Sequence, residues 1–262
     1  MKLISLNTWG GRIYQPLIDF ISQHSKDTDI FCFQEVYTTS LDIKQYKGLL
    51  RTNLLEEFRG ILPEFRSYYF PNFSGYDNNA DSVEFDLSYG QAIFIKKTIK
   101  VIAHKNYFIQ KYKNFEGPDK MFSNIPTPLQ KIQFSIDDKI FSVFNFHGTP
   151  YPSAKKDTRR RLKQSTKVKT IMDSVKGAKI LVGDFNLSKN TKSIRIFEDE
   201  MRNLIKEFKI KRTRSKVSPF YGKSNFQKFA DYTFVSPDIK VENFQVPDIE
   251  ISDHLPMILE FN

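Results

Sequence analysis

Residues 180–188, with the sequence ILVGDFNLS, form an apolar run that ends in a carboxylate and an amide. Side chains alternate between the two faces of a strand, so Asp184 and Asn186 would share one face if the backbone stayed extended through Phe185. They would then present an acceptor and a donor–acceptor group to the same volume. The alternative is an ordinary strand-to-loop turn, in which Asp, Asn and Gly are common.

Polar residues also lie at the ends of other apolar segments: some follow a predicted strand, whereas Asp231 begins one and Asp253 and His254 precede the last one. They are Asn7, Glu35, His147, Asp231, Asp253 and His254. Carboxylate and amide oxygens are ligands for hard cations such as Mg²⁺ and Mn²⁺. Imidazoles can act as acids, as bases or as stabilisers of an anionic transition state. Because ligands of α/β proteins often bind beyond the carboxyl ends of strands, we expect these side chains to form one site.

Two stretches of the sequence each predict a strand, a helix and a second strand. Their bounds are 2–7, 16–25 and 29–35 in the first stretch, and 139–147, 157–175 and 178–184 in the second. Leu17, Phe20 and Ile21 have the spacing of an apolar helix face, and Pro16 suits the first turn of that helix. The apolar strands of both stretches run into the polar residues described above.

The rest of the chain predicts further strands, two helices and two long loops. The strands are at 90–97, 100–109, 130–136, 231–236, 239–246 and 256–261, the helices at 53–62 and 193–208, and the loops at 75–88 and 110–129. Loops of this length in a compact domain are often functional. Because no Pro-rich, Gly/Ser-rich or low-complexity linker divides the chain, we expect a single domain over residues 1–262. The pattern favours a mixed α/β fold with two packed sheets and helices outside them.

Six short motifs, taken in order, make the chain similar to the endonuclease/exonuclease/phosphatase superfamily, the group of deoxyribonuclease I, exonuclease III and the apurinic endonucleases. They are LNTWGGR with Asn7, FQEV with Glu35, FHGT with His147, GDFN with Asp184 and Asn186, ADYTFVS with Asp231, and SDHLP with Asp253 and His254. The resemblance implies a four-layer α/β sandwich of the deoxyribonuclease I type. It also implies metal-assisted attack of water on a phosphoester.

The resemblance assigns metal and water positions first. Glu35 would hold Mg²⁺ or Mn²⁺, and Asp253 would help to complete the coordination shell. Asn7 would either complete this shell or contact the phosphate. Asp184 would orient or deprotonate the attacking water, and Asn186 would hold the scissile phosphate or the water. The metal would offset the charge on a phosphate oxygen.

The two histidines receive acid, base or phosphate-binding roles from the same resemblance. His254, paired with Asp253, would act on the phosphate or as a base. Asp231 would orient His147, and together they would supply a second acid/base or phosphate contact. Apurinic endonucleases usually have an acidic residue where Trp9 stands and a Tyr where His147 stands. The chain therefore favours the branch that resembles deoxyribonuclease I and the sphingomyelinases.

Four further residues have both a functional and a structural interpretation. Gln91 begins a predicted strand where relatives often carry an amide near the phosphate. Arg161 and Gln164 resemble an Arg–Gln pair that follows the His motif in many relatives. Gln91 and Arg161 are therefore candidate substrate-binding residues, and Arg161 could instead brace the site. Trp9 could stack on a base or sugar, but packing beneath the metal site is the interpretation we favour.

Charge points to an anionic partner. The chain has a formal net charge of +10, with basic runs at 155–169 and 206–216. Since cationic side chains supply the main sequence-independent affinity for nucleic acids, the first hypothesis is a Mg²⁺- or Mn²⁺-dependent nuclease acting on DNA or RNA. The alternative enzyme is a phosphatase or phosphodiesterase for a small-molecule or lipid phosphate ester. A catalytically inactive nucleic-acid-binding module is disfavoured because the motif residues are retained.

The sequence also predicts the surroundings of the protein. The single cysteine, Cys32, excludes an intramolecular disulfide and fits a reducing compartment. The apolar run at the N-terminus is too short for a signal peptide, and none approaches the roughly 20 residues that span a bilayer. We therefore expect a monomeric, cytoplasmic protein without a transmembrane segment.

Overall fold

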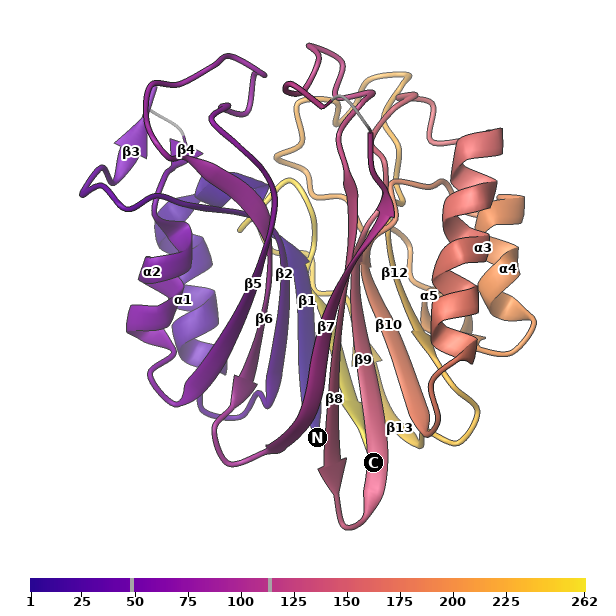
Figure 1. The fold of residues 1–262 in the computed structure, drawn as a ribbon. Helices are drawn as coiled ribbons and strands as arrows, with labels where there is room; N and C mark the ends of the chain where they lie inside the picture. Colours follow the sequence, from indigo (N-terminus) through magenta and orange to yellow (C-terminus); the bar gives the residue numbers. More distant parts are fainter. Residues whose placement is uncertain (48–49, 113–114) are drawn as a thin grey trace.

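The computed structural model describes residues 1–47, 50–112 and 115–262 as two packed sheets with helices on their outer faces (Figure 1). The first sheet has the strand order β13-β14-β1-β2-β6-β5, and the second has the order β11-β12-β10-β9-β8-β7. Helices α1 and α2 cover the first sheet, and α3, α4 and α5 lie beside the second. This is the four-layer α/β sandwich that the motifs predicted.

The strands of the two sheets have the following bounds. In the first sheet they are β1 (Lys2–Asn7), β2 (Ile30–Thr38), β5 (Phe65–Ser74), β6 (Ser88–Lys96), β13 (Val241–Gln245) and β14 (Met257–Phe261). In the second they are β7 (Lys100–Gln110), β8 (Thr127–Ile136), β9 (Lys139–His147), β10 (Ala178–Asp184), β11 (Arg202–Asn203) and β12 (Asp231–Val235). Outside these sheets, β3 (Gln45–Tyr46) pairs antiparallel with β4 (Leu50–Arg51).

The helices are short, and one of them differs from the prediction. They are α1 (Tyr14–His24), α2 (Leu54–Ile61), α3 (Arg159–Asp173), α4 (Lys192–Glu198) and α5 (Leu204–Glu207), with a 3-10 turn η1 at Trp9–Gly11. The helix predicted at 193–208 is divided because Asn203 pairs with the edge of β12 and then caps α5, accepting the Lys206 N–H through its side chain. Among the described residues, no helix is long and apolar enough to cross a membrane.

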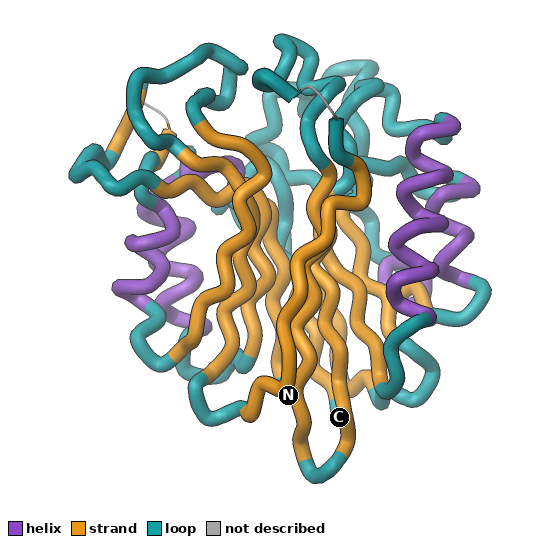
Figure 2. Tube along the Cα trace, in the orientation of Figure 1, coloured by secondary structure: helices purple, strands orange, loops and turns teal. Residues whose placement is uncertain are grey.

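Each half of the sandwich repeats one arrangement that brings polar side chains to the same end. β1 and β2 are parallel and joined through α1, while β9 and β10 are parallel and joined through α3. The carboxyl ends of all four strands therefore point the same way. The register sets Asp184 beside His147 on one side and beside Asp231 on the other. The longer loops lie at this end of the molecule, whereas the connections at the opposite end are mostly short (Figure 2).

Apolar cores lie between the two sheets and beneath the helices. Leu3 of the first sheet shares one cluster with Val143 of the second, and another cluster packs Phe33 of β2 against Phe58 of α2. Apolar burial of this kind is the main stabilising term of the fold. Cys32 belongs to the cluster between the sheets and is fully buried, and burial raises the pKa of its thiol.

The sequence missed one long strand and estimated loop bounds loosely. β5 was not predicted, because Arg66, Ser67 and Pro71 interrupt its apolar pattern, yet it pairs along its length with β6. The predicted loop at 75–88 does connect β5 to β6. The predicted loop at 110–129 connects β7 to β8, but its first residue belongs to β7 and its last three belong to β8. Residues 113–114 of this predicted loop lie outside the residues that the structure describes.

Gly183, immediately before Asp184, lets β9 and β10 approach closely. Its φ is +131°, and a Cβ placed there would lie 2.1 Å from the Phe146 carbonyl oxygen. We expect Gly183→Ala to lower the free energy of unfolding by more than about 2 kcal/mol, because both the backbone conformation and the contact are unfavourable. Gly60→Ala is the control: open space surrounds Gly60 in α2, so this change should be neutral or stabilising. Equal effects in urea unfolding would contradict the prediction.

Candidate active site

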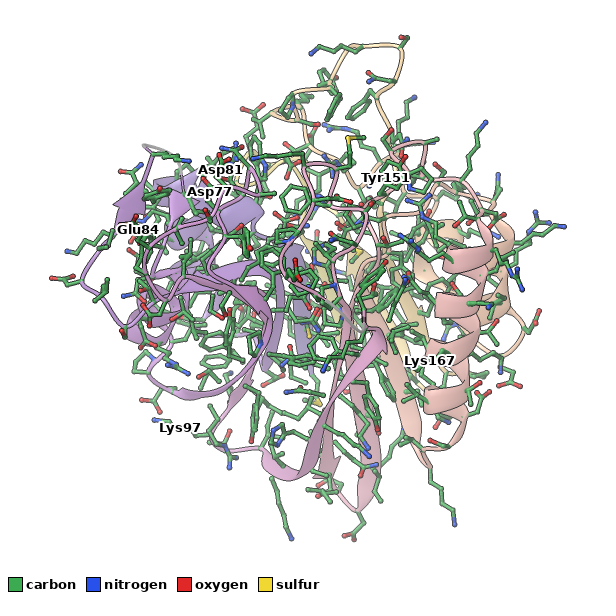
Figure 3. All side chains as sticks on the ribbon, turned by 45° about the horizontal axis from the view of Figure 1, so that its top comes forward. Asp77, Asp81, Glu84, Lys97, Tyr151 and Lys167 are labelled. Atoms are coloured by element: carbon green, nitrogen blue, oxygen red, sulfur yellow. The ribbon has the colours of Figure 1, made fainter. Side chains whose placement is uncertain are left out.

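A pocket of about 240 Å³ opens where the strands of both sheets end. Its floor contains Glu35, His147 and Asp184, and two loops add Asn78 and Phe122 to its walls. In Figure 3, which brings this end forward, Asp77 and Asp81 lie on one side of the molecule and Tyr151 on the other. The pocket is therefore built by both halves of the sandwich and closed in by the loops between β5 and β6 and between β7 and β8.

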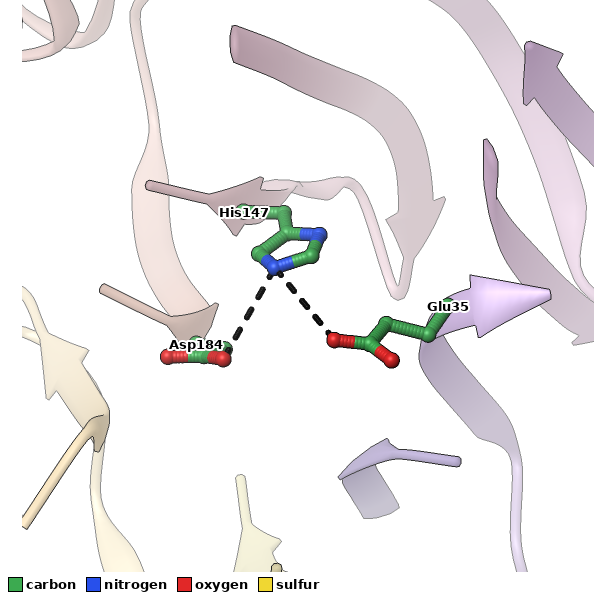
Figure 4. Close-up of side chains that lie close together, drawn as sticks. All are labelled: Glu35, His147 and Asp184. Atoms are coloured by element: carbon green, nitrogen blue, oxygen red, sulfur yellow. Dashed lines mark ion pairs between the residues drawn. The ribbon is translucent and has the colours of Figure 1, made fainter. Parts of the chain in front are cut away.

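Three side chains from three strands meet at the base of the pocket (Figure 4). His147 Nε2 lies 3.9 Å from Glu35 Oε1 and 3.7 Å from Asp184 Oδ2. Glu35 sits at a register shift between β2 and β6 with a φ of +57°, and such bulges commonly re-aim a side chain. Local backbone strain is thus used to point this carboxylate at the strands of the other sheet.

Asn7 holds the two carboxylates together. Its Nδ2 donates to Glu35 Oε1 at 3.0 Å and to Asp184 Oδ2 at 3.1 Å, while its Oδ1 accepts the Trp9 backbone N–H at 3.0 Å. The Trp9 N–H fixes the orientation of the amide, since only the oxygen can accept it. In this structure Asn7 is therefore a positioning group, and its oxygen does not face the carboxylates as a metal ligand would.

The strand β10 ends at Asp184, and a turn follows it. Asp184 Oδ1 accepts the Asn186 backbone N–H at 2.8 Å, and Asn186 has a left-handed φ of +53°. Asn186 Nδ2 donates to the Gly148 carbonyl at 3.0 Å and to Asp184 Oδ2 at 3.2 Å. The strand-to-loop turn is therefore confirmed, and this turn, not a continued strand, brings Asp184 and Asn186 into the lining of one pocket.

His254 is oriented by Asp231, which corrects the predicted pairing. His254 Nδ1 lies 2.8 Å from Asp231 Oδ1, so Asp231 serves His254 and not His147. Asp231 opens β12 beside β10, and the Thr213 hydroxyl accepts its backbone N–H at 3.1 Å. Asp253 Oδ2 instead accepts from Arg214 Nη2 at 2.6 Å, and Asp253 Oδ1 is 3.8 Å from His254 Nε2.

The contacts of His254 determine its protonation. Arg214 Nη1 lies 2.5 Å from His254 Nε2, and a guanidinium can only donate. Nε2 therefore accepts, which leaves the proton on Nδ1, where it is donated to Asp231. Burial and then the neighbouring Arg214 charge lower the pKa of His254, in agreement with a neutral ring.

Two cations of the site were not identified individually from the sequence. Lys155 Nζ donates to Asn186 Oδ1 and to the Pro150 carbonyl, and burial lowers the pKa of Lys155 to about 8. Arg214 bridges Asp253 and His254. The available signal was position, since Lys155 begins one basic run and Arg214 lies in the other. Both line the pocket and could contact a phosphate.

The structure places Gln91 and Arg161 away from the pocket lining. Gln91 is fully buried between the sheets, where its Nε2 donates to the Asn145 carbonyl at 2.9 Å. Arg161 is 1% exposed and donates to four carbonyls that shape the preceding loop, those of Thr149, Pro150, Pro152 and Lys156. These contacts fit bracing, not substrate binding, because the guanidinium is engaged by the loop.

Trp9 lines the pocket instead of packing fully beneath it. Its side chain is partly exposed, and the Arg12 guanidinium carbon lies 4.9 Å from the centre of its ring. A stacking role for this ring is therefore open to test, contrary to the interpretation favoured from the sequence.

The residues present fit a divalent cation. Donor atoms of Glu35, His147 and Asp184 lie within 4.8 Å of one another, and so do those of Asp184, Asp231 and His254. In the second group Asp231 and the His254 Nδ1 are already hydrogen-bonded to each other, so the first group is the better candidate. Burial raises the pKa of Glu35, and the Asp184 charge adds to this effect. A bound cation would offset that unfavourable concentration of negative charge.

The Asp231–His254 pair gives a prediction of its own. Asp231→Asn should lower kcat/KM for a phosphoester roughly 10²–10⁴-fold, because the amide no longer fixes the tautomer of His254. Asp173→Asn, an exposed change at the end of α3, is the control. A variant that keeps the wild-type kcat/KM would show that the Asp231–His254 contact has no part in the reaction.

Comparison with known proteins identifies the class. The family model described as "Endonuclease/Exonuclease/phosphatase family" matches residues 4–254. The chain belongs to this family, a superfamily of phosphoric ester hydrolases. A search of curated proteins found no match.

Solved structures share the fold at low sequence identity. A mannosyl-6-phosphatase from Bacteroides thetaiotaomicron is 17% identical, with 100% of this chain and 99% of that chain covered and a TM-score of 0.71. A family protein from Bacteroides vulgatus is 16% identical, with 100% and 98% covered and a TM-score of 0.70. The human Nocturnin catalytic domain is 14% identical, with 100% and 94% covered and a TM-score of 0.67.

Proposed function

We propose that this chain is a Mg²⁺- or Mn²⁺-dependent phosphodiesterase whose substrate is DNA or RNA. The observation that carries the proposal is the convergence, in one pocket, of a candidate metal cluster, a tautomer-fixed histidine and two cations. A divalent cation bound there would supply Lewis-acid stabilisation of charge on the phosphate. The remaining chemistry is assigned to the side chains of the chain itself.

Asp184 is the side chain best placed to orient or deprotonate an attacking water. Although burial alone would raise its pKa, the surrounding positive charge lowers it; the His254 and His147 rings contribute to this charge when protonated, and Lys155 and Arg214 contribute to it as neighbouring cations. Asn7 and Asn186 donate to it and hold it in place. Asp184 is therefore ionised at neutral pH and fixed in direction, as a water-orienting carboxylate must be.

The cations and His254 are assigned to the phosphate. Lys155 and Arg214 lie on the same wall of the pocket, where they would attract the phosphate and stabilise charge that increases in the transition state. Asp231 holds the Nδ1 proton of His254, while His254 Nε2 accepts from Arg214. If a bound phosphate draws Arg214 away, Nε2 becomes free to take up a proton, and the ring can then act as a cation toward the phosphate.

Nucleic acid is favoured as the substrate by charge. The formal net charge is +10, and Arg12, Lys155 and Arg214 line the pocket itself. Each phosphate contact made by such side chains contributes salt-dependent, sequence-independent affinity.

One observation favours the alternative, a phosphatase or phosphodiesterase for a small-molecule or lipid phosphate. The pocket is only about 240 Å³, and Asn78, Phe122 and Ile125 narrow its loop-covered side. A terminal phosphate would enter such a pocket more easily than one inside a duplex.

The proposal is tested with a labelled panel: single- and double-stranded DNA, an abasic duplex, RNA, and small phosphomonoesters and phosphodiesters. Each is incubated with Mg²⁺ at low and high salt. Cleavage of a nucleic acid that weakens as salt rises supports a nuclease. Cleavage of the small esters alone would replace the proposal with the alternative.

A further inference from the structure

A second pocket of about 530 Å³ adjoins the active-site pocket. Lys155 and Arg214 line both pockets, so the two share a cationic wall. The second pocket continues along the segment before β12, which contributes Phe220, Phe226 and Gln227. Its size falls in the range of pockets that hold small organic ligands.

The lining of the second pocket also includes an aromatic ring and an acceptor without a donor. Phe220 is 48% exposed, which is unusual for a phenylalanine and leaves its ring available for stacking. Gln227 Nε2 donates to the Ser153 carbonyl at 2.5 Å, while its Oε1 is buried and accepts no hydrogen bond from the residues that the structure describes. A buried acceptor without a donor costs free energy unless a ligand supplies one.

We propose that the second pocket binds the nucleobase of a nucleotide ester whose phosphate lies against Lys155 and Arg214. This inference rests on the proposed function and deepens it by naming a base-recognition site. The base would stack on Phe220, and a rotation of the Gln227 amide that exposes its buried Oε1 would let this oxygen accept an exocyclic amino or ring N–H group.

A nucleobase fits these features better than a sugar or an acyl chain. A flat aromatic ring uses the exposed face of Phe220, and base–aromatic stacking contributes substantially to affinity. An acyl chain has no donor for Gln227, and a sugar has no aromatic face for stacking. Lys223 Nζ lies over the Phe220 ring, 5.9 Å from its centre, and adds positive charge next to this ring, which suits a phosphorylated ligand.

The test is calorimetric binding to the full chain with Mn²⁺. The probes are phosphonate analogues of adenosine 5′-monophosphate, ribose 5-phosphate and glucose 6-phosphate, in which a methylene group replaces the ester oxygen. We expect the adenosine analogue to bind roughly tenfold more tightly than either sugar analogue. Phe220→Ala should remove most of this preference, and Gln227→Leu should reduce it.

Phe208→Ala is the matched control, because Phe208 is also an exposed phenylalanine but lies outside both pockets. It should keep the tenfold preference. Equal binding of the three analogues, or a preference that survives Phe220→Ala, would overturn the inference. If the wild type hydrolyses phosphoesters but binds the three analogues equally, only the proposed base site is refuted. A retained preference supports the base site even if the panel shows no nuclease activity.

Discussion

Asp184→Asn should lower the turnover of a phosphoester by about 10³-fold or more. Asp184 contacts more than one other residue of the candidate site. It accepts hydrogen bonds from Asn7 and Asn186. Its Oδ2 lies 3.7 Å from a ring nitrogen of His147 and 3.7 Å from a ring nitrogen of His254. The amide keeps the shape of the side chain but removes the charge that would orient or deprotonate water. The rate loss is measured as kcat with saturating Mn²⁺.

The loss must be separated from unfolding. Asp199→Asn, an exposed carboxylate at the end of α4, is the matched control and should keep the wild-type rate. Circular dichroism and the Tm of Asp184→Asn should remain close to those of the wild type in the absence of metal. If folded Asp184→Asn retained near-wild-type kcat, Asp184 could not have the role assigned to it.

The second large effect concerns the metal. Mn²⁺ should raise the Tm of the wild type, because an ion that binds only the folded state stabilises that state. At a free ion concentration of 100 times the Kd, the free energy of unfolding increases by about 2.7 kcal/mol. Glu35→Gln should lose most of this rise and most of the activity. A neutral amide is a weaker ligand for a hard cation than a carboxylate.

Differential scanning calorimetry of both proteins, with Mn²⁺ and with EDTA, makes the comparison. Glu250→Gln removes an exposed carboxylate outside the pocket and controls for non-specific binding of the ion. A Glu35→Gln protein that is stabilised by Mn²⁺ as much as the wild type would place the ion elsewhere.

The architecture could be predicted because its signals are local. The strands β1, β2, β9 and β10 are continuous apolar runs, and parallel pairs joined through a helix bring their carboxyl ends to one edge. β5 and the division of α4 from α5 were missed because they depend on tertiary pairing, with β6 in one case and β12 in the other. Such pairing overrides the local pattern.

The site was predicted as a set of residues but not as a set of contacts. Asp253 and His254 are adjacent in sequence, yet the histidine turns to Asp231 because β12 brings that carboxylate from 23 residues away. Lys155 and Arg214 were present only as members of basic runs, and nothing local distinguishes a buried cation from a solvated one. Gln91 and Arg161 were predicted to bind substrate but lie away from the pocket lining. Gln91 is buried between the sheets and Arg161 is buried against loop carbonyls, and the sequence alone does not indicate either environment.

The most direct test of the central claim is product release from the labelled phosphoester panel by one wild-type preparation, first in EDTA and then after addition of excess Mn²⁺. The structure predicts no release above background in EDTA and recovery of activity with the metal, because the clustered Glu35, His147 and Asp184 side chains need a cation to act on a phosphate. Equal release in EDTA and in Mn²⁺ would contradict a metal-dependent phosphoric ester hydrolase.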